Sequence, residues 1–156
     1  MPEVTLVDVP TQLVLGIQRR GHYSEIPVAF GEIVQYAMAN GAQLVGMPLA
    51  IMHELSKEAA EKANLDGTAV IDVAFPIAKA VKGSEVVKCY KLPGCKMAKT
   101  VHKGPYETCE VTYNALYEWL AKQGMQITGP TREAYLNDPR TVKPEEILTE
   151  IYAPVD

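Results

Sequence analysis

Two short segments of the chain each place a glutamate two residues before a tyrosine. They are Glu133-Ala134-Tyr135 and Glu150-Ile151-Tyr152. Both have strand-like composition, and side chains in a strand alternate between the two faces of a sheet. Each glutamate should therefore project on the same face as its own tyrosine. If the two intervening residues face the helices, the other face of the sheet presents two carboxylates and two phenols.

A set of this kind suits the binding of a flat, lipophilic cation. Aromatic faces attract cations and stack on rings, and a carboxylate withdrawn from water is costly unless a positive group offsets it. Met52, in an earlier strand, would add an adaptable wall. The alternative is a solvated sheet face, on which Glu133 pairs with Arg132 or with a lysine elsewhere. Spacing alone favours this alternative.

The elements that position these residues occur twice. With an offset of 83 positions (Pro93 minus Pro10), residues 10–46 align without a gap with residues 93–129. The identities are mainly glycine and proline, which fix backbone geometry: Pro10/Pro93, Gly21/Gly104, Tyr23/Tyr106, Val28/Val111, Gly41/Gly124, Gln43/Gln126 and Gly46/Gly129. The sequence predicts one domain, 1–156, with internal repeats at about 1–78 and 84–156. A seam between two repeats is a natural place for a ligand pocket.

Each repeat is predicted to contain two strands, a main helix and two further strands. Apolar residues at helical spacing follow Pro27 and end at Asn40-Gly41, and the second helix spans 108–123. The predicted strands are 4–7, 13–17, 47–52, 69–75, 86–90, 96–101, 132–136 and 148–152. The segment 56–63 could form a short extra helix, although its Ala/Glu/Lys composition predicts little beyond a solvated surface. Two such units give an α+β fold, a curved antiparallel sheet with both helices on one side.

The acidic and aromatic residues are not shared equally by the repeats. The offset places Ala50 and Met52 where the second repeat has Glu133 and Tyr135, and Asp72 matches Glu150 once a shorter loop is allowed for. A pocket built from both repeats would therefore be asymmetric.

Other aromatic residues of the second repeat are weaker candidates. Tyr106, after the Gly104 turn, and Trp119, at the edge of the apolar helix stripe, would either line a cavity or complete the core. Tyr113 and Tyr117 align with Phe30 and Val34, which predicts core packing for both.

Composition argues against several classes of function. The net charge is −4 and the pI about 5.4, whereas a nucleic-acid surface normally needs a basic patch. The N-terminus does not resemble a signal peptide and no apolar run is long enough for a membrane span. Three cysteines without C-x-x-C spacing indicate reduced thiols in a cytoplasmic protein. We expect neither a metal nor a cofactor, because there is no ligand spacing, phosphate loop or nucleophile elbow.

Several motifs of the second repeat resemble one family in combination. They are His-Lys-Gly-Pro-Tyr-Glu-Thr at 102–108, the helix end from Trp119 to Gly124, the segment 129–139 and the segment 149–155. Together they resemble the GyrI-like (gyrase-inhibitor-like) small-molecule-binding domain. This is also the effector-binding module of AraC-type and MerR-type transcription regulators. The resemblance covers essentially the whole chain and implies a duplicated four-stranded unit with one main helix in each copy.

The resemblance also implies a ligand pocket at the seam, lined by aromatics and floored by a carboxylate. Carried over by motif, Glu133 is the pocket acid, and Glu150, Tyr135, Tyr152, Tyr106 and Trp119 are its walls. The implied ligands are lipophilic, cationic aromatic molecules, bound for multidrug-type sensing or sequestration. Because the first strand is predicted to begin at residue 4, with no DNA-binding segment ahead of it, we expect a stand-alone binder.

Two alternatives follow from the same family. Some members hydrolyse cyclopropane-bearing DNA-alkylating compounds, and Glu133 would then act as general base on water beside Tyr135 or Trp119. This role requires burial to raise the carboxyl pKa towards neutrality. The other alternative is a protein-binding role, as an inhibitor or protector of DNA gyrase.

Overall fold

A computed structural model describes residues 3–54 and 56–156. The chain forms two compact units. One contains Pro10–Gly94, and the other contains Cys95–Asp156 together with the N-terminal segment through Val9. Each unit is described by itself.

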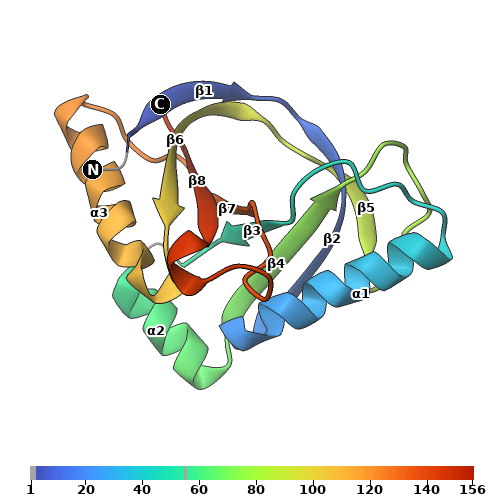
Figure 1. Cartoon of the computed structure of the whole chain (residues 1–156). Helices are drawn as coiled ribbons and strands as arrows, with labels where there is room; N and C mark the ends of the chain where they lie inside the picture. The colour runs from blue at the N-terminus through green and yellow to red at the C-terminus, as the bar shows by residue number, and fades with distance from the viewer. Residues whose placement is uncertain (1–2, 55) are drawn as a thin grey trace. The chain divides into compact units, whose positions relative to one another are not determined.

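The unit formed by Pro10–Gly94 is a four-stranded antiparallel sheet with two helices. Its strands follow the order β3-β4-β2-β5, and α1 packs along β2 and β4 (Figure 1). The bounds of its elements are β2 Gln12–Gly21, α1 Ile26–Ala39, β3 Leu49–Met52, α2 Lys57–Asp66, β4 Ala69–Pro76 and β5 Lys88–Leu92. The short helix α2 matches the prediction at 56–63, with Ser56 accepting a hydrogen bond from Ala59 N–H at its start.

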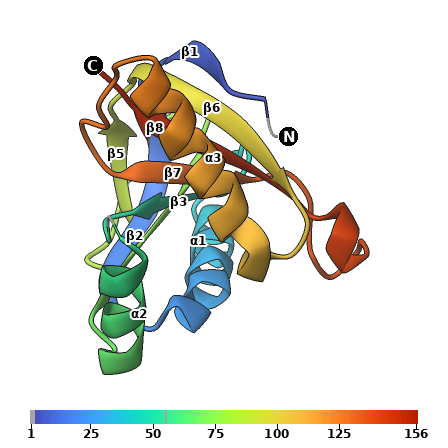
Figure 2. The same cartoon turned by 90° about the vertical axis from the view of Figure 1, so that its left-hand side faces the viewer.

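The other unit repeats this plan with one helix. Its strands follow the order β1-β6-β8-β7, all antiparallel, and α3 packs against β6 (Figure 2). The bounds are β1 Thr5–Val9, β6 Cys95–Lys103, α3 Cys109–Lys122, β7 Thr131–Tyr135 and β8 Leu148–Pro154. A single 3-10 turn, Tyr106–Thr108, leads into α3. The predicted α+β fold, a duplicated sheet with one main helix per copy, is confirmed.

Strand register shows that the two copies are equivalent in three dimensions. Gln18 lies opposite Asp72 in one sheet, and Val101 lies opposite Glu150 in the other. Val101 minus Gln18 is again 83, so Asp72 and Glu150 hold matching positions, as the sequence indicates. Helices α1 and α3 also end alike, at Gly41 and Gly124 with φ of +67° and +68°, a conformation that favours glycine.

The first strand of each repeat joins the sheet of the other repeat. β1 pairs with β6, and β5 pairs with β2. A tight hairpin between β1 and β2 would need positive φ values, and neither Pro10 nor Thr11 has one. The chain therefore passes from β1 into β2 without a tight hairpin. It passes from β5 to β6 in the same way at Pro93-Gly94, where Gly94 N–H donates to Thr11 Oγ1 at 3.1 Å.

An apolar core holds α3 against its sheet. It contains Ala98, Leu116, Leu120, Ile151, Ala153 and Val155. Leu116 and Leu120 lie one helical turn apart, so they project from the same stripe of α3. This stripe determines which face of the sheet is covered by the helix.

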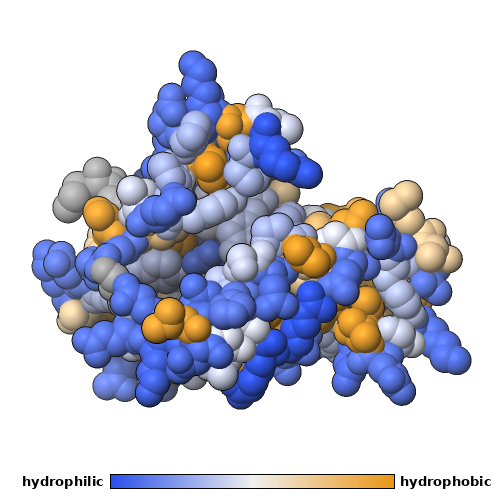
Figure 3. Space-filling model, turned by 90° about the horizontal axis from the view of Figure 1, so that it is seen from below, coloured by the Kyte–Doolittle hydropathy of each residue, from blue (hydrophilic) through white to orange (hydrophobic). Residues whose placement is uncertain are grey.

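The exposed surface is mostly hydrophilic on the face drawn in Figure 3, with hydrophobic side chains in small separate groups. Among the described residues, no helix has both the length and the apolar character that a membrane crossing requires.

Candidate ligand-binding site

The register of β7 and β8 decides which side chains share a face. Glu133 lies directly opposite Ile151, and Ala134 lies opposite Glu150. Directly opposed residues of an antiparallel pair project on the same side of the sheet. Because Ile151 packs with the α3 core, Glu133 and Tyr135 lie on the helix-covered face, and Glu150 and Tyr152 lie on the other.

The expectation that both Glu-x-Tyr pairs share one face is therefore wrong, as is the placement of Ala134 towards the helix. Alternation within each strand is as predicted. The relative phase of two strands, however, depends on their pairing register, which residue spacing within either strand does not contain.

The carboxylate of Glu133 accepts one phenol proton at each oxygen. Tyr135 O–H donates to Oε1 at 2.8 Å, and Tyr113 O–H, from α3, donates to Oε2. Burial, followed by the negative charge of Glu133, holds the pKa of both phenols well above the usual 10.0. Both tyrosines therefore remain protonated donors throughout the neutral range.

Two further tyrosines extend this cluster towards solvent. The Tyr106 ring meets the Tyr135 ring edge-on with centroids 5.6 Å apart, and the Tyr117 ring lies 6.0 Å from that of Tyr113. Tyr106 and Tyr117 are each 40% exposed. Burial and then the charge of Glu133 raise the pKa of both. The result is a carboxylate among four tyrosines, two of which reach the surface.

Helix α3 supplies two of the four tyrosines, Tyr113 and Tyr117, and its periodicity places them on one side. Cys109, Tyr113 and Tyr117 are four residues apart and therefore lie on one stripe. The Cys109 thiol is buried at the start of the stripe, and burial, with the charge of Glu133 next, raises its pKa to about 12. This thiol is thus a poor nucleophile at neutral pH.

A buried histidine anchors the turn that leads into α3. His102, on β6, places Nδ1 2.6 Å from Thr112 Oγ1 and Nε2 2.9 Å from the Pro105 carbonyl oxygen. Gly104 adopts φ of +129° in this turn, and its N–H donates to the Ile147 carbonyl at 2.8 Å. These contacts hold Tyr106 and the first turn of α3 against the sheet.

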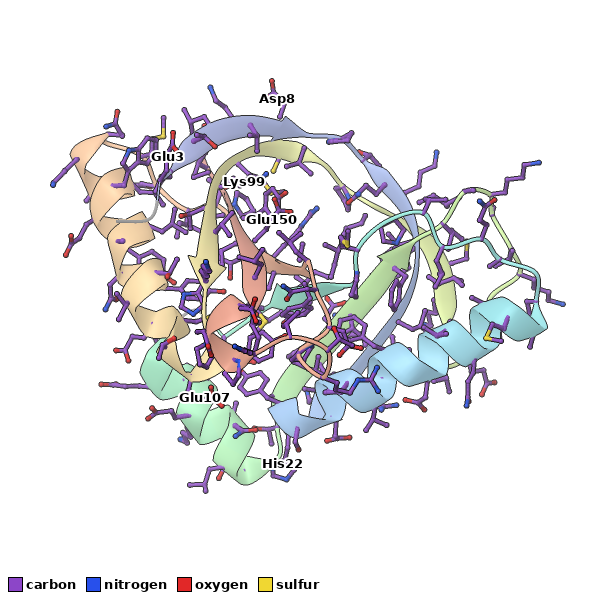
Figure 4. The ribbon with its side chains drawn as sticks, in the orientation of Figure 1. Glu3, Asp8, His22, Lys99, Glu107 and Glu150 are labelled. Atoms are coloured by element: carbon purple, nitrogen blue, oxygen red, sulfur yellow. The ribbon has the colours of Figure 1, made fainter. Side chains whose placement is uncertain are left out.

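On the opposite face, Glu150 already has a cation. Lys99 Nζ lies 2.7 Å from Glu150 Oε2 and 5.7 Å from the centre of the Tyr152 ring. Tyr152 O–H donates to Glu150 Oε1 at 3.1 Å. Figure 4 shows Lys99 and Glu150 next to each other on neighbouring strands. The hydrogen bond to Glu150 is the main cause that raises the pKa of Lys99.

The Glu133 carboxylate has no such partner. Among the residues that the structure describes, no lysine, arginine or histidine forms an ion pair with it. Arg132, which the sequence suggests as a partner of Glu133, projects on the other face because it lies opposite Tyr152. Glu133 thus has hydrogen-bond donors but no counter-charge within this part of the chain.

The structure therefore brings together Glu133, Tyr135 and Tyr106, and separates them from other candidates of the same unit. Glu150 and Tyr152 lie across the sheet, and Trp119 packs against the apolar core of α3. Met52 is in β3, which belongs to the unit formed by Pro10–Gly94.

Sequence reasoning missed Tyr113 and Tyr117. Alignment with Phe30 and Val34 predicted core packing for both. Tyr113 does pack against the core under α3, but its hydroxyl also donates to Glu133, where the first repeat has Ala50. The spacing of four residues from Cys109 to Tyr113 to Tyr117 could have shown that the three share one stripe of the helix. The glutamate that Tyr113 contacts, however, lies on a different element, β7. Within the described ranges, no group of three or more His, Cys, Asp or Glu side chains is arranged to hold a metal ion.

Comparison with family models identifies the family of the chain. The model of the GyrI-like small molecule binding domain matches residues 2–156. The chain belongs to this family. It is therefore a GyrI-like small-molecule-binding domain, and the resemblance noted in the sequence is confirmed. No protein with a curated description matches the chain.

Four solved structures show the same fold at low sequence identity. The C-terminal domain of EcmrR has a TM-score of 0.82 at 21% identity, with 100% of this chain and 98% of that chain covered. The match to the chain of an EcmrR–DNA complex covers 99% of this chain but only 57% of the length of that chain, with a TM-score of 0.84 at 21% identity. SAV2435 bound to tetraphenylphosphonium has a TM-score of 0.60 at 16% identity (99% and 94% covered). A hydrolase from Listeria innocua has a TM-score of 0.71 at 16% identity (99% and 92% covered).

Proposed function

We propose that this GyrI-like domain binds lipophilic, cationic aromatic molecules, for sensing or sequestration, through Glu133 and the tyrosines around it. The observation that carries the proposal is the difference between two carboxylates. Glu150 is paired with Lys99 at 2.7 Å, whereas Glu133 has only phenol donors among the described residues. A part-buried carboxylate without a counter-charge is stabilised by a cation that enters beside it.

The aromatic residues support the same class of ligand. Tyr106 and Tyr117 are partly exposed, and their rings lead to Tyr135 and Tyr113 at the carboxylate. Ring faces attract cations, with the strongest effect where water is displaced. The structure of SAV2435, which shares this fold, holds tetraphenylphosphonium, a cation of this kind.

A titration with tetraphenylphosphonium tests the proposal directly. Isothermal calorimetry on the wild type should give a Kd below about 1 mM. Glu133→Gln should weaken binding by about thirtyfold or more, because an unpaired charge then remains on the ligand side. Glu150→Gln is the matched control, since it makes the same change two residues before a tyrosine, and should alter the Kd by less than about twofold.

Two results would contradict the proposal. An absence of binding at millimolar ligand would reject the function. Equal weakening by Glu133→Gln and Glu150→Gln would reject the site while leaving the ligand class intact. Circular dichroism of both variants provides the check on folding.

Hydrolysis of a reactive ligand is a second candidate. It draws support from the carboxylate beside Tyr135 and from the Listeria innocua hydrolase that shares the fold. A general base needs a free lone pair directed at water; each oxygen of Glu133 accepts one phenol proton and keeps a second acceptor position. Incubation with a cyclopropane-bearing alkylator, followed by mass spectrometry, should return unreacted compound. A product that has gained one water with the wild type but not with Glu133→Gln would establish the enzyme instead.

A further inference from the structure

We propose that the outward face of α1 is the interface of a weak homodimer, in which α1 of one copy packs antiparallel on α1 of a second copy about a two-fold axis. The inference concerns the unit formed by Pro10–Gly94 and does not depend on the proposed ligand. It follows from the side chains that α1 directs away from its sheet.

Four residues form one exposed stripe on α1, the outer stripe: Val28, Gly31, Gln35 and Met38. At about 3.6 residues per turn they lie together on the side of the helix opposite Ile33, which is fully buried. Val28 is 59% exposed and Met38 is 79% exposed. The described part of the chain therefore leaves the outer stripe open to solvent.

The glycine of the outer stripe is not required by the fold of the chain. Gly31 lies in the interior of α1, where glycine lowers helix stability relative to alanine. A Cβ at this position would meet no atom within 4 Å among the described residues, and the φ of Gly31 is not positive. A glycine on a helix surface allows the backbone of a second helix to approach closely.

The spacing of the outer stripe suits a second copy of the same helix. Its intervals of three, four and three residues are those of a seam between two packed helices. About a two-fold axis, residue i of one copy contacts residue j of the other, and j contacts i. An antiparallel pair centred between Gly31 and Gln35 places Val28 against the partner's Met38 and Gly31 against the partner's Gln35. Each contact then joins a smaller residue to a longer one.

Charge favours a copy of this chain as the occupant. The net charge is −4, so two copies repel unless the surfaces that meet are uncharged. Glu32 is the one charged residue of α1, and Arg19 Nη2 already lies 2.7 Å from its carboxylate. Pro27 and Ala39, which flank the outer stripe, are uncharged as well. The α1 face can therefore meet itself without like-charge repulsion, and the antiparallel direction brings opposite helix ends together.

The equivalent helix of the other repeat lacks these properties. With the offset of 83, α3 has Asn114 and Glu118 in the corresponding stripe, and Glu110 and Lys122 beside it. This is the polar, charged surface that a solvated helix presents to water. The two helices share their buried side and their glycine ends, so the difference is confined to the outward face.

Sedimentation velocity of the full chain over a series of concentrations tests the proposal. A pair of 14-residue helices buries less than the roughly 800 Å² per partner of a standard interface, so we expect a Kd of about 10–1,000 μM. Gln35→Glu introduces the charge that α3 carries at the same position and should weaken the dimer by about tenfold or more. Gln123→Glu makes the same change at the exposed end of α3 and should alter the Kd by less than about twofold.

Gly31→Ala separates association from helix stability. Alanine meets no neighbour in the single chain and is the better helix former, so the melting temperature in dilute solution should rise. The added methyl group also keeps a second helix at a distance and should weaken the dimer by about fivefold. A glycine with only a local role would change the first measurement and not the second.

Disulfide crosslinking tests the direction of the two helices. The background is Cys89→Ser with Cys95→Ser, which leaves buried Cys109 as the native thiol. Proteins with Val28→Cys and with Met38→Cys should form linked dimers quickly when mixed and slowly when either is oxidised alone, because a disulfide needs the two Cα atoms within about 7 Å.

Several outcomes would overturn the proposal. A wild type that remains monomeric at millimolar concentration has no such interface. A dimer that is unchanged by both Gln35→Glu and Gly31→Ala, with circular dichroism showing that both variants are folded, uses another surface. Faster crosslinking of Val28→Cys or Met38→Cys alone than of their mixture would reject the antiparallel arrangement.

Discussion

Glu133 and Glu150 have the same local sequence context and different surroundings. Each stands two residues before a tyrosine, each lies in a strand of the same four-stranded sheet, and each accepts a hydrogen bond from that tyrosine. Glu150 also contacts Lys99, whereas Glu133 contacts Tyr113. The neighbours supplied by other elements decide whether the carboxylate charge is already compensated.

The two faces of the sheet account for this difference. On the face covered by α3, the neighbours of Glu133 come from a helix stripe of cysteine and tyrosine. On the other face, the neighbour of Glu150 comes from β6, where Lys99 lies opposite Tyr152. The same Glu-x-Tyr pattern thus leaves Glu133 without a counter-ion among the described residues, whereas Glu150, across the sheet, forms an ion pair with Lys99.

The largest expected effect is on the reactivity of the Cys109 thiol, which lies on the face covered by α3. Raising a thiol pKa from 9.0 to about 12 lowers its thiolate fraction about a thousandfold, since each pKa unit is a factor of ten. At pH 8, Ellman's reagent should therefore modify exposed Cys95 quickly and Cys109 very slowly. Glu133→Gln should accelerate modification of Cys109, although burial, the larger cause, still protects it.

Glu150→Gln is the control for that reaction, because Glu150 lies across the sheet from the thiol. If Cys109 reacts as fast as Cys95, or if the two glutamine variants have the same effect on its rate, the α3 face is not the closed environment described above. Cys89→Ser removes the third, half-buried thiol and simplifies the kinetics.

The assignment of faces can be tested through the residue between Glu150 and Tyr152. Ile151 is fully buried against α3, so Ile151→Ala should lower the free energy of unfolding by about 2–5 kcal/mol in urea denaturation. Val101, opposite Glu150 on the other face, is 39% exposed. Val101→Ala should cost about 1 kcal/mol or less. Similar losses for the two variants would contradict the assignment.

Much of the fold could be predicted from the sequence. The offset of 83, the glycines that end α1 and α3, and the alternation within each strand all appear in the structure. These features are local or repeated, so they leave a signal in one chain. The exchange of β1 and β5 could not be predicted, because strand pairing depends on partners distant in sequence.

The candidate site was predicted less completely for the same reason. Glu133, Tyr135 and Tyr106 were named from motifs, and the structure places them in one cluster. Tyr113 was predicted to pack in the core, and it does, but nothing in its own helix shows that its hydroxyl meets a carboxylate from β7. The pairing of Glu150 with Lys99 was also missed, since it requires the register between β6 and β8.

The phenols on Glu133 should also affect stability in alkaline solution. A pKa raised by folding stabilises the native state fully below the unfolded value of about 10, and this contribution is lost as pH rises towards the folded value. Tyr113 and Tyr135 both have pKa values well above 10.0. Each should therefore cost about 1 kcal/mol of unfolding free energy between pH 10 and pH 11.

Urea unfolding of the wild type, Glu133→Gln and Glu150→Gln at pH 10 and at pH 11 measures this loss. Glu133→Gln should reduce the loss, because removal of its charge lowers the folded pKa of two buried phenols. Glu150→Gln acts on Tyr152, whose pKa is raised less, and on Lys99, whose pKa is raised by its hydrogen bond to Glu150. An equal change in the two variants would mean that the Glu133 cluster is no more enclosed than the Glu150 cluster.

The smallest expected effect is that of breaking the closed ion pair. The side chain of Lys99 is 31% exposed and that of Glu150 is 17% exposed, so solvent and salt screen their attraction. Lys99→Met should keep the packing of the side-chain stem and lower the unfolding free energy by no more than about 1 kcal/mol. The loss should shrink at high salt, which urea denaturation at two sodium chloride concentrations would measure. A larger loss that does not depend on salt would mean that Lys99 acts by packing, and the contrast between a compensated and an uncompensated glutamate would then lose its electrostatic basis.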